Sequence, residues 1–228
     1  MKTLCNCKSR DVISEFLGTF ILVMIGVGSI SVNEISEVIG NFGIALSFGL
    51  AVYFCIHLFS ASSGAHLNPV VSLIFYLIGA CSFRATMNYI VAQLLGAAAA
   101  ALCLKAVFGH SLLAGVTRVH MGVSLYNAFF IEGVMTFILI MSILTTRNPA
   151  IISIAVFLDA FIGGPLTGAS MNPARSFGPA LAMGYWDNQW LYWAAPLSGG
   201  LAAVACCQLF MPQLKSPSPE VPSRTECL

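Results

Sequence analysis

Two Asn-Pro pairs and one arginine are the residues of this sequence with the clearest chemical purpose. Asn68-Pro69 and Asn172-Pro173 lie 104 positions apart, and Arg175 follows the second pair without an acidic residue nearby in the chain. Asparagine is a strong N-cap and proline is favoured in the first helical turn, so each pair predicts the start of a helix. Helix starts carry unpaired N–H groups and a partial positive charge. The sequence therefore predicts two hydrogen-bond-donating helix ends, with one cation beside the second.

The composition places these helices in a membrane. Of the 228 residues, 58% are hydrophobic and 8% are charged, and such a chain cannot cover itself with a polar surface. Ten Lys and Arg residues against nine Asp and Glu residues leave a net charge of +1, which is too little for a nucleic-acid-binding surface. We therefore expect the lipid bilayer as a partner and no nucleic acid.

Six apolar stretches are long enough to cross a bilayer as helices. Each is near the roughly 20 residues that a span requires. The two segments that start at Asn-Pro, 68–78 and 172–182, are only about half as long. We therefore expect an all-α membrane protein with six transmembrane helices and two re-entrant half-helices. The predicted spans are 12–31, 39–59, 84–107, 123–145, 150–167 and 190–211.

The two halves of the chain repeat the same motifs in the same order. Each half contains three predicted spans, an odd number, so the second half must be inverted in the membrane relative to the first. Inverted repeats with interrupted helices place a permeation or binding site near the midplane. The matched motifs are Glu15-x-x-x-Thr19 with Glu132-x-x-x-Thr136, GAHLNPV from Gly64 with GASMNPA from Gly168, and Ala92-Gln93 with Ala195-Pro196.

The basic residues predict the orientation of the chain. With a cytoplasmic N-terminus, seven of the ten Lys and Arg residues lie inside, as the positive-inside rule favours. Both termini are then cytoplasmic. We expect an N-terminal segment at 1–10, a membrane domain at 11–211 with repeats at about 11–107 and 123–211, and a disordered tail at 212–228.

No other group of residues indicates catalysis or metal binding. Asp159, His57 and His120 lie far apart in the chain, and none of them belongs to a nucleophile–base pairing. Most of the eight cysteines lie in or beside apolar runs, where cysteine acts as a small hydrophobic residue. Cys5 and Cys7 precede the first span and could instead be acylated. We expect no enzyme activity, no cofactor and no metal.

These features resemble the aquaporin, or major intrinsic protein, family, which has six spans and two half-helices with Asn-Pro-Ala boxes. The resemblance covers about residues 11–211 and rests on the two boxes, the Glu-x-x-x-Thr repeats and the segment NPARSFGPAL. The stretches GGPLTGASMNPARSFGPAL and WLYWAAPLSGG are most similar to the aquaporin 8 branch, which is associated with water, ammonia and hydrogen peroxide. The boxes are Asn68-Pro69-Val70, where valine replaces alanine at the contact expected between the half-helices, and Asn172-Pro173-Ala174.

The resemblance implies roles for individual residues. Asn68 and Asn172 would donate to a passing water molecule, and Arg175 would narrow the outer vestibule and repel cations together with the half-helix dipoles. Glu15 and Glu132 would hold the re-entrant backbone in place. The carbonyls that would line the pore belong to Gly64, Ala65, His66, Gly168, Ala169 and Ser170, although the His66 side chain could merely pack.

The resemblance also implies a selectivity ring, and counting from the boxes places the family's ring positions at Phe48, Ala160, Ala169 and Arg175. Water-only relatives carry histidine at the position of Ala160, so the resemblance implies a wider and less polar ring here. A helix turns by about 100° per residue, so an error of one in the count would direct Asp159 or Phe161 towards the pore. Ser176 stands where glycerol channels carry aspartate.

We therefore expect a homotetramer of passive channels in the plasma membrane or an intracellular membrane. Each subunit would conduct water and small neutral solutes such as ammonia, hydrogen peroxide and urea, and would exclude protons and ions. A secondary transporter also uses inverted repeats and broken helices, but it normally needs an ion-coupling acid near the midplane. A structural or junctional membrane protein with this fold and a blocked pore is the third alternative.

Overall fold

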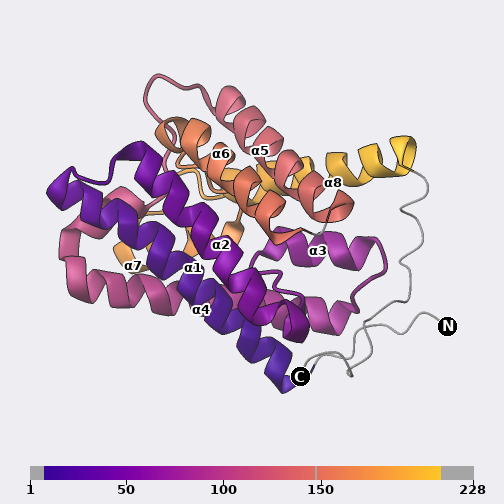
Figure 1. Cartoon of the computed structure of the whole chain (residues 1–228). Coiled ribbons are helices and arrows are strands. Elements are labelled where there is room, and N and C mark those ends of the chain that lie inside the picture. The colour runs from indigo at the N-terminus through magenta and orange to yellow at the C-terminus, as the bar shows by residue number, and fades with distance from the viewer. Residues whose placement is uncertain (1–7, 147, 212–228) are drawn as a thin grey trace.

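Helices form almost all of the chain that the computed structural model describes, which is residues 8–146 and 148–211 (Figure 1). Six of the helices in this part of the chain are long and apolar enough to cross a membrane. The six predicted spans and the two short helices after the Asn-Pro pairs are thereby confirmed. In chain order the elements are α1 (Ser9–Ser36), α2 (Gly40–Ser63), α3 (Pro69–Leu77), α4 (Phe83–Phe108), the 3-10 helix η1 (Gly109–Gly115), α5 (Leu125–Thr145), α6 (Pro149–Thr167), α7 (Pro173–Met183) and α8 (Leu191–Phe210).

The short helices α3 and α7 begin at the two prolines, as the sequence predicts. The side-chain oxygen of Asn68 accepts the Val70 N–H at 2.9 Å, and that of Asn172 accepts the Ala174 N–H at 3.0 Å. Both asparagines have extended backbone, as an N-cap requires. The helices end after 9 and 11 residues, which is too short to span a bilayer. Figure 1 shows them towards opposite ends of the bundle.

Glycines allow the long helices of each half to cross closely. A Cβ atom built on Gly96 of α4 would lie 2.3 Å from the Phe16 carbonyl oxygen of α1. In the second half, a Cβ atom on Gly199 of α8 would lie 2.0 Å from the Gly133 carbonyl oxygen of α5. No side chain fits at such distances, so both crossings require glycine. The packing of α1 on α4 is thus repeated by α5 on α8.

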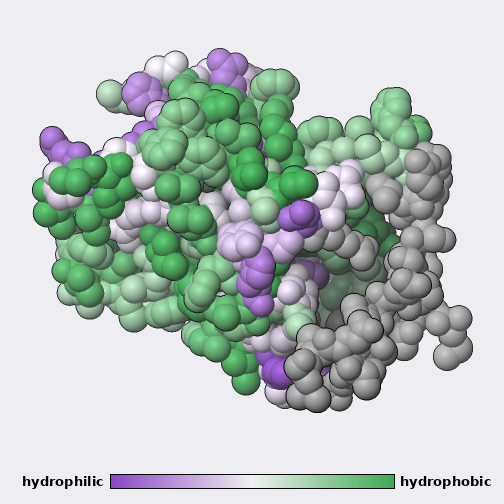
Figure 2. Space-filling model, viewed as in Figure 1, coloured by the Kyte–Doolittle hydropathy of each residue, from purple (hydrophilic) through white to green (hydrophobic). Residues whose placement is uncertain are grey.

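The distribution of polarity suits a bilayer. Apolar side chains such as Leu95 and Ile154 are exposed, whereas Glu15, Gln93 and Glu132 are fully buried. Figure 2 shows that hydrophobic residues cover most of the coloured surface on the face in view. The polar chemistry of this protein therefore lies inside the helical bundle.

The expected tail at 212–228 and residues 1–7 of the expected N-terminal segment lie outside the described residues, as do Cys5 and Cys7. Their predicted disorder and acylation stay predictions.

Candidate permeation site

The N-terminal ends of α3 and α7 meet inside the bundle. The side-chain amide of Asn68 donates to the Met171 carbonyl at 2.8 Å, and that of Asn172 donates to the Leu67 carbonyl at 2.8 Å. Each asparagine therefore holds the segment that precedes the other one. A carboxamide NH₂ group has two hydrogens, so each side chain retains one N–H for another acceptor. Both asparagines border the central cavity described below.

The chain takes the same unusual backbone course before each Asn-Pro pair. We call residues 64–68 the first re-entrant segment and residues 168–172 the second. Non-glycine residues in the left-handed region cost on the order of 1–3 kcal/mol each, so contacts from other elements must stabilise these segments. The left-handed φ angles are 89°, 51° and 55° at Gly64, Ala65 and Leu67, and 84°, 43° and 51° at Gly168, Ala169 and Met171.

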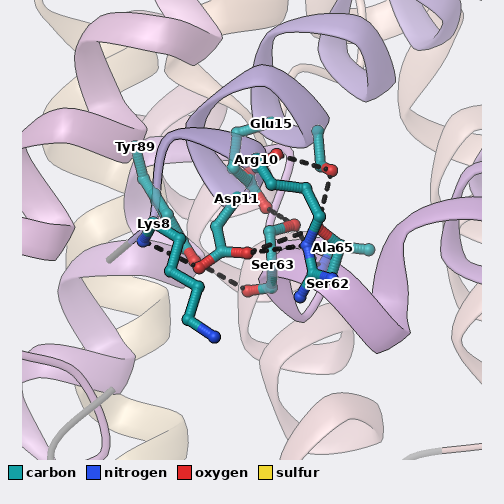
Figure 3. A network of polar contacts seen from close by, with 9 residues as sticks. Lys8, Arg10, Asp11, Glu15, Ser62, Ser63, Ala65 and Tyr89 are labelled. Atoms are coloured by element: carbon teal, nitrogen blue, oxygen red, sulfur yellow. Dashed lines mark hydrogen bonds and ion pairs between the residues drawn. The ribbon is translucent and has the colours of Figure 1, made fainter. Parts of the chain in front are cut away.

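Glu15 of α1 stabilises the first re-entrant segment. Its Oε1 atom accepts the Ser63 hydroxyl at 2.5 Å and the His66 N–H at 2.9 Å. Its Oε2 atom accepts the Leu67 N–H at 2.7 Å and the Gln93 side-chain amide at 2.8 Å. Burying a carboxylate is tolerable only when donors replace its hydration, and four donors do so here. Figure 3 shows Glu15 beside Ser63 and Ala65, at the end of α2.

Glu132 of α5 makes the matching contacts in the second half. Its Oε1 atom accepts the Thr167 hydroxyl at 2.7 Å and the Ser170 N–H at 2.8 Å, and its Oε2 atom accepts the Met171 N–H at 2.9 Å. Thr167, Ser170 and Met171 follow Ser63, His66 and Leu67 by 104 positions. Both glutamates thus contact the backbone that the family resemblance predicts, one with four donors and the other with three.

A pair of tyrosines adds support that the sequence interpretation missed. The Tyr89 hydroxyl donates to the Ser63 carbonyl at 3.2 Å, and the Tyr192 hydroxyl donates to the Thr167 carbonyl at 2.8 Å. Each bond satisfies a carbonyl at the C-terminal end of a long helix, just before a re-entrant segment. The signal was present, because extending the match of Ala92 with Ala195 back by three residues pairs Tyr89 with Tyr192.

The first turn of α1 is tied to the end of α2 by a further polar cluster (Figure 3). Asp11 is buried, and its carboxylate accepts the Lys8 backbone N–H at 3.0 Å and the Ser62 hydroxyl at 3.3 Å. The Ser14 and Ser62 hydroxyls lie 2.8 Å apart, and Arg10 reaches Asp11 at 3.6 Å. Because Ser62 and Ser63 border the cavity, these contacts position this part of the cavity wall.

Arg175 lies in the first turn of α7 with only 2% of its surface exposed. One guanidinium nitrogen, Nη1, donates to the Gly115 carbonyl at 2.9 Å, and the guanidinium carbon lies 5.1 Å from the centre of the Phe48 ring. The Nε atom has no hydrogen-bond partner within residues 8–146 and 148–211. The cation is therefore held by a backbone carbonyl and an aromatic face.

The four residues assigned to the selectivity ring lie in one region. Phe48, Ala160 and Ala169 belong to one apolar cluster, with Arg175 over Phe48. Phe48, Ala169 and Arg175 border the cavity, but Ala160 does not. Ile152 and Val156 of α6 border the cavity. Ala160 lies on the same face of α6, one helical turn beyond Val156.

Asp159 and Phe161, the neighbours of Ala160 in the chain, do not line the cavity. Phe161 is 41% exposed and packs against Phe42 and Phe157 on the outside of the bundle, so it does not face the pore. Asp159 is buried, and its Oδ2 atom has no hydrogen-bond partner in the described part of the chain. Asp159 does not border the cavity either. No contact within residues 8–146 and 148–211 explains why this acid is buried.

A cavity of about 640 Å³ connects these features. It extends from Ser60 near the end of α2 and Cys81 between α3 and α4, past His66 and the two asparagines, to Arg175. The walls are largely apolar, and the polar groups converge at the re-entrant segments. Of the carbonyl-bearing positions predicted to line the pore, Gly64, Ala65, His66, Ala169 and Ser170 border the cavity, and Gly168 does not.

Val70 occupies a different place from the one expected. The sequence suggested that its extra methyl groups lie between the two half-helices. The structure places Val70 in a separate apolar cluster with Ile74, Ile140 and Ala203, so it packs towards α5 and α8. Gly200 leaves room for the valine, because a side chain at that position would begin with a Cβ atom only 3.2 Å from Val70. The Asn68 cap is intact beside it.

Six spans, two half-helices that meet at their N-termini, and a cavity running past them define a membrane channel built from inverted repeats. Known proteins agree. The family model for the major intrinsic proteins matches residues 3–206. The X-ray structure of the aquaglyceroporin from Plasmodium falciparum has the same fold, with a TM-score of 0.78 and 26% identity over 90% of this chain and 98% of that one.

Curated relatives are similar over most of their length. Aquaporin NIP1-2 of Oryza sativa subsp. japonica is 36% identical over 86% of this chain and 70% of its own. Aquaporin TIP4-4 of Zea mays is 34% identical over 90% and 88%, and aquaporin-4 of Mus musculus is 36% identical over 90% and 69%. The chain belongs to the major intrinsic protein, or aquaporin, family of membrane channels for water and small solutes. Its resemblance to the aquaporin 8 branch stays a prediction.

Proposed function

We propose that this protein is a passive channel that conducts water and small neutral solutes and excludes protons and ions. The observation that carries the proposal is the meeting of Asn68 and Asn172 inside one cavity. Each carboxamide has an N–H to offer to a passing oxygen, and the two helix N-termini add partial positive charge where they meet. Arg175 adds a full charge. Cations therefore meet a repulsive field along the same path that offers donors to water.

The composition of the selectivity ring supports passage of solutes other than water. Ala160 and Ala169 are small and apolar, so Phe48 and Arg175 are the two large side chains of the ring. Ammonia, hydrogen peroxide and urea would pass more easily through such a ring than through one narrowed by histidine. The predicted similarity to the aquaporin 8 branch agrees with ammonia and peroxide as solutes.

We also propose a homotetramer with one pore per subunit and both termini in the cytoplasm, in the plasma membrane or an intracellular membrane. The distribution of basic residues supports this orientation. The exposed apolar side chains of the spans can contact either lipid or a neighbouring copy.

Stopped-flow light scattering of proteoliposomes tests the proposal. We expect fast osmotic shrinkage with the protein and slow shrinkage of empty liposomes, and measurable ammonia, peroxide and urea flux. Two tryptophan variants on α6 serve as controls. Val156→Trp places an indole in the cavity and should abolish flux, whereas Leu158→Trp changes a residue that is 47% exposed on the outside and should not. Flux no faster than empty liposomes would favour the non-conducting alternative, and flux that needs an ion gradient would favour a transporter.

A further inference from the structure

Each half-helix contains one buried serine, but the two serines have different partners. Ser72 of α3 accepts the Gln93 side-chain amide at 3.0 Å and contacts the His66 Nδ1 atom at 3.1 Å. Ser176 of α7, 104 positions later in the chain, accepts the Thr117 hydroxyl at 2.9 Å and contacts the Ser170 hydroxyl at 2.6 Å. The partners in the re-entrant segments, His66 and Ser170, are equivalent positions of the two halves. The other donors, Gln93 and Thr117, are not equivalent.

The internal repeat explains why the second donor differs. Pro196 of α8 stands where the first half has Gln93 on α4, and proline offers neither a side-chain donor nor a backbone N–H. The residue that donates to Ser176 instead lies between η1 and α5, in the connection between the two halves. Thr117 is fully buried there, although it belongs to a loop.

The hydroxyl groups form a chain with a defined direction. The Ser170 hydroxyl donates to the Asn172 carbonyl at 3.0 Å. Because each hydroxyl has a single hydrogen, Ser176 must then donate to Ser170, and Thr117 donates to Ser176. The chain therefore runs from the connecting loop to the residue that caps α7. Thr117 and Ser176 are fully buried and do not border the cavity, so bulk water could not readily replace a donor missing between them.

The last residue of η1, just before this loop, holds the arginine of the selectivity ring. The Gly115 carbonyl, two residues before Thr117, accepts from Arg175 at 2.9 Å. A Cβ atom on Gly168 would lie 3.0 Å from the Thr117 Cα atom, so the loop packs directly on the second re-entrant segment. Movement of Thr117 would therefore displace both the acceptor of Arg175 and the backbone that carries Ala169.

We propose that Thr117 is a positioning residue of the selectivity ring: its hydroxyl fixes the second re-entrant segment and Arg175 as Gln93 fixes the first segment. The effect on solute selectivity rests on the proposed channel function, whereas the effect on the backbone does not. The two are measured separately.

Hydrogen exchange with mass spectrometry tests the backbone effect without any transport assay. Thr117→Val keeps the shape of the side chain and removes the donor. We expect several-fold faster amide exchange in residues 168–172, with exchange in residues 64–68 unchanged. Thr117→Ser retains a hydroxyl and should restore slow exchange. Thr19→Val is the matched control, because Thr19 is equally buried and its hydroxyl has no hydrogen-bond partner within the described residues.

The ratio of urea to water flux in proteoliposomes tests the effect on selectivity. We expect this ratio to rise several-fold in Thr117→Val, to return in Thr117→Ser and to stay unchanged in Thr19→Val. Ser176→Ala interrupts the same chain and should give the same change, and the double variant should add little to either single one. If Thr117→Val yields no folded protein, Ser176→Ala takes its place in both assays.

Equal exchange rates in residues 168–172 and an unchanged flux ratio would overturn the assignment of Thr117. Additive effects of Thr117→Val and Ser176→Ala would also overturn it, because they would show two independent contacts. A wild-type protein without flux would instead contradict the proposed channel function, and the exchange rates would still decide the role of Thr117.

Discussion

The two re-entrant halves share a backbone course but obtain their hydrogen-bond donors from different places. In the first half, Gln93 of α4 donates to both Glu15 and Ser72. In the second half, proline stands at that position, Glu132 accepts three bonds, and Thr117 of the connecting loop donates to Ser176. A duplicated backbone therefore does not require duplicated side chains. It requires that the buried N–H groups of each re-entrant segment and the carboxylate beside them have hydrogen-bond partners from some neighbouring element.

A second difference concerns charge. Val71 and Arg175 are equivalent positions, 104 residues apart, in the first turns of α3 and α7, and both border the cavity. Among the described residues that border the cavity, Arg175 of the second half is therefore the one lysine or arginine. The N-terminal ends of α3 and α7 repel cations where the two half-helices meet, and Arg175 adds repulsion on one side of this meeting point.

Arg175→Ala should have the largest effect on selectivity. We expect a severalfold or larger rise in urea and glycerol flux and a measurable ion conductance, because the side chain both fills the ring and repels cations. The yield of folded protein should change little, since one carbonyl and one ring are the main contacts of the guanidinium. Val71→Ala, at the equivalent position of the first half, should leave ions excluded. Unchanged selectivity in Arg175→Ala would remove this residue from the proposed ring.

Glu132→Gln should lower the amount of folded protein more than the flux per folded channel. Glutamine has one acceptor atom, so either the Ser170 or the Met171 N–H would lose its partner, which costs about 1–3 kcal/mol. Glu15→Gln should cause a similar loss, because the His66 and Leu67 N–H groups also donate to different oxygens of one carboxylate. Detergent-solubilised yield and thermal unfolding measure stability, and proteoliposome flux per protein measures function. Normal yield with lost flux would argue for a direct role of Glu132 in the pore.

The elements were predictable from the sequence, and many of the contacts between them were not. Asn68 and Asn172 indicated the half-helices because capping depends on neighbouring residues. Glu15 and Glu132 were identified through the repeat and the family resemblance. The roles of Gln93 and Thr117 were not predictable, because they depend on which helix or loop packs behind a re-entrant segment. The burial of Asp159 away from the cavity was not predictable either, because it depends on which face of α6 packs against the other helices.

Ala160→His should reduce the ratio of ammonia to water flux severalfold. The imidazole would extend the row of Ile152 and Val156 into the ring, and would make the opening smaller and more polar. Water should still pass. Ala160→Ser adds one hydroxyl without filling the space, and should change the ratio much less. Stopped-flow measurements of both solutes on the same proteoliposomes give the ratio. An unchanged ratio would mean that residue 160 does not reach the ring, and the proposed broad selectivity would lose its main support.

Gln93→Leu should have the smallest effect of these changes, a loss of about 1–2 kcal/mol in stability, with flux retained. It removes one of the four donors to Glu15 and leaves three, the number that Glu132 has. It also removes the buried Gln93 Oε1 atom, which has no partner within the described chain. Thermal unfolding of the purified protein provides the measurement. A loss of stability as large as that of Glu15→Gln would contradict this prediction, because it would show that three donors do not suffice for Glu15 as they do for Glu132.

Separating water flux from proton flux in one preparation tests the central claim most directly. Proteoliposomes containing a pH-sensitive dye would be given an osmotic gradient, and then a potassium diffusion potential through valinomycin. If the two asparagines donate to water while the helix ends and Arg175 repel cations, shrinkage will be fast and the internal pH will not follow the potential any faster than in empty liposomes. Slow shrinkage, or an internal pH that follows the potential faster than in empty liposomes, would contradict the account.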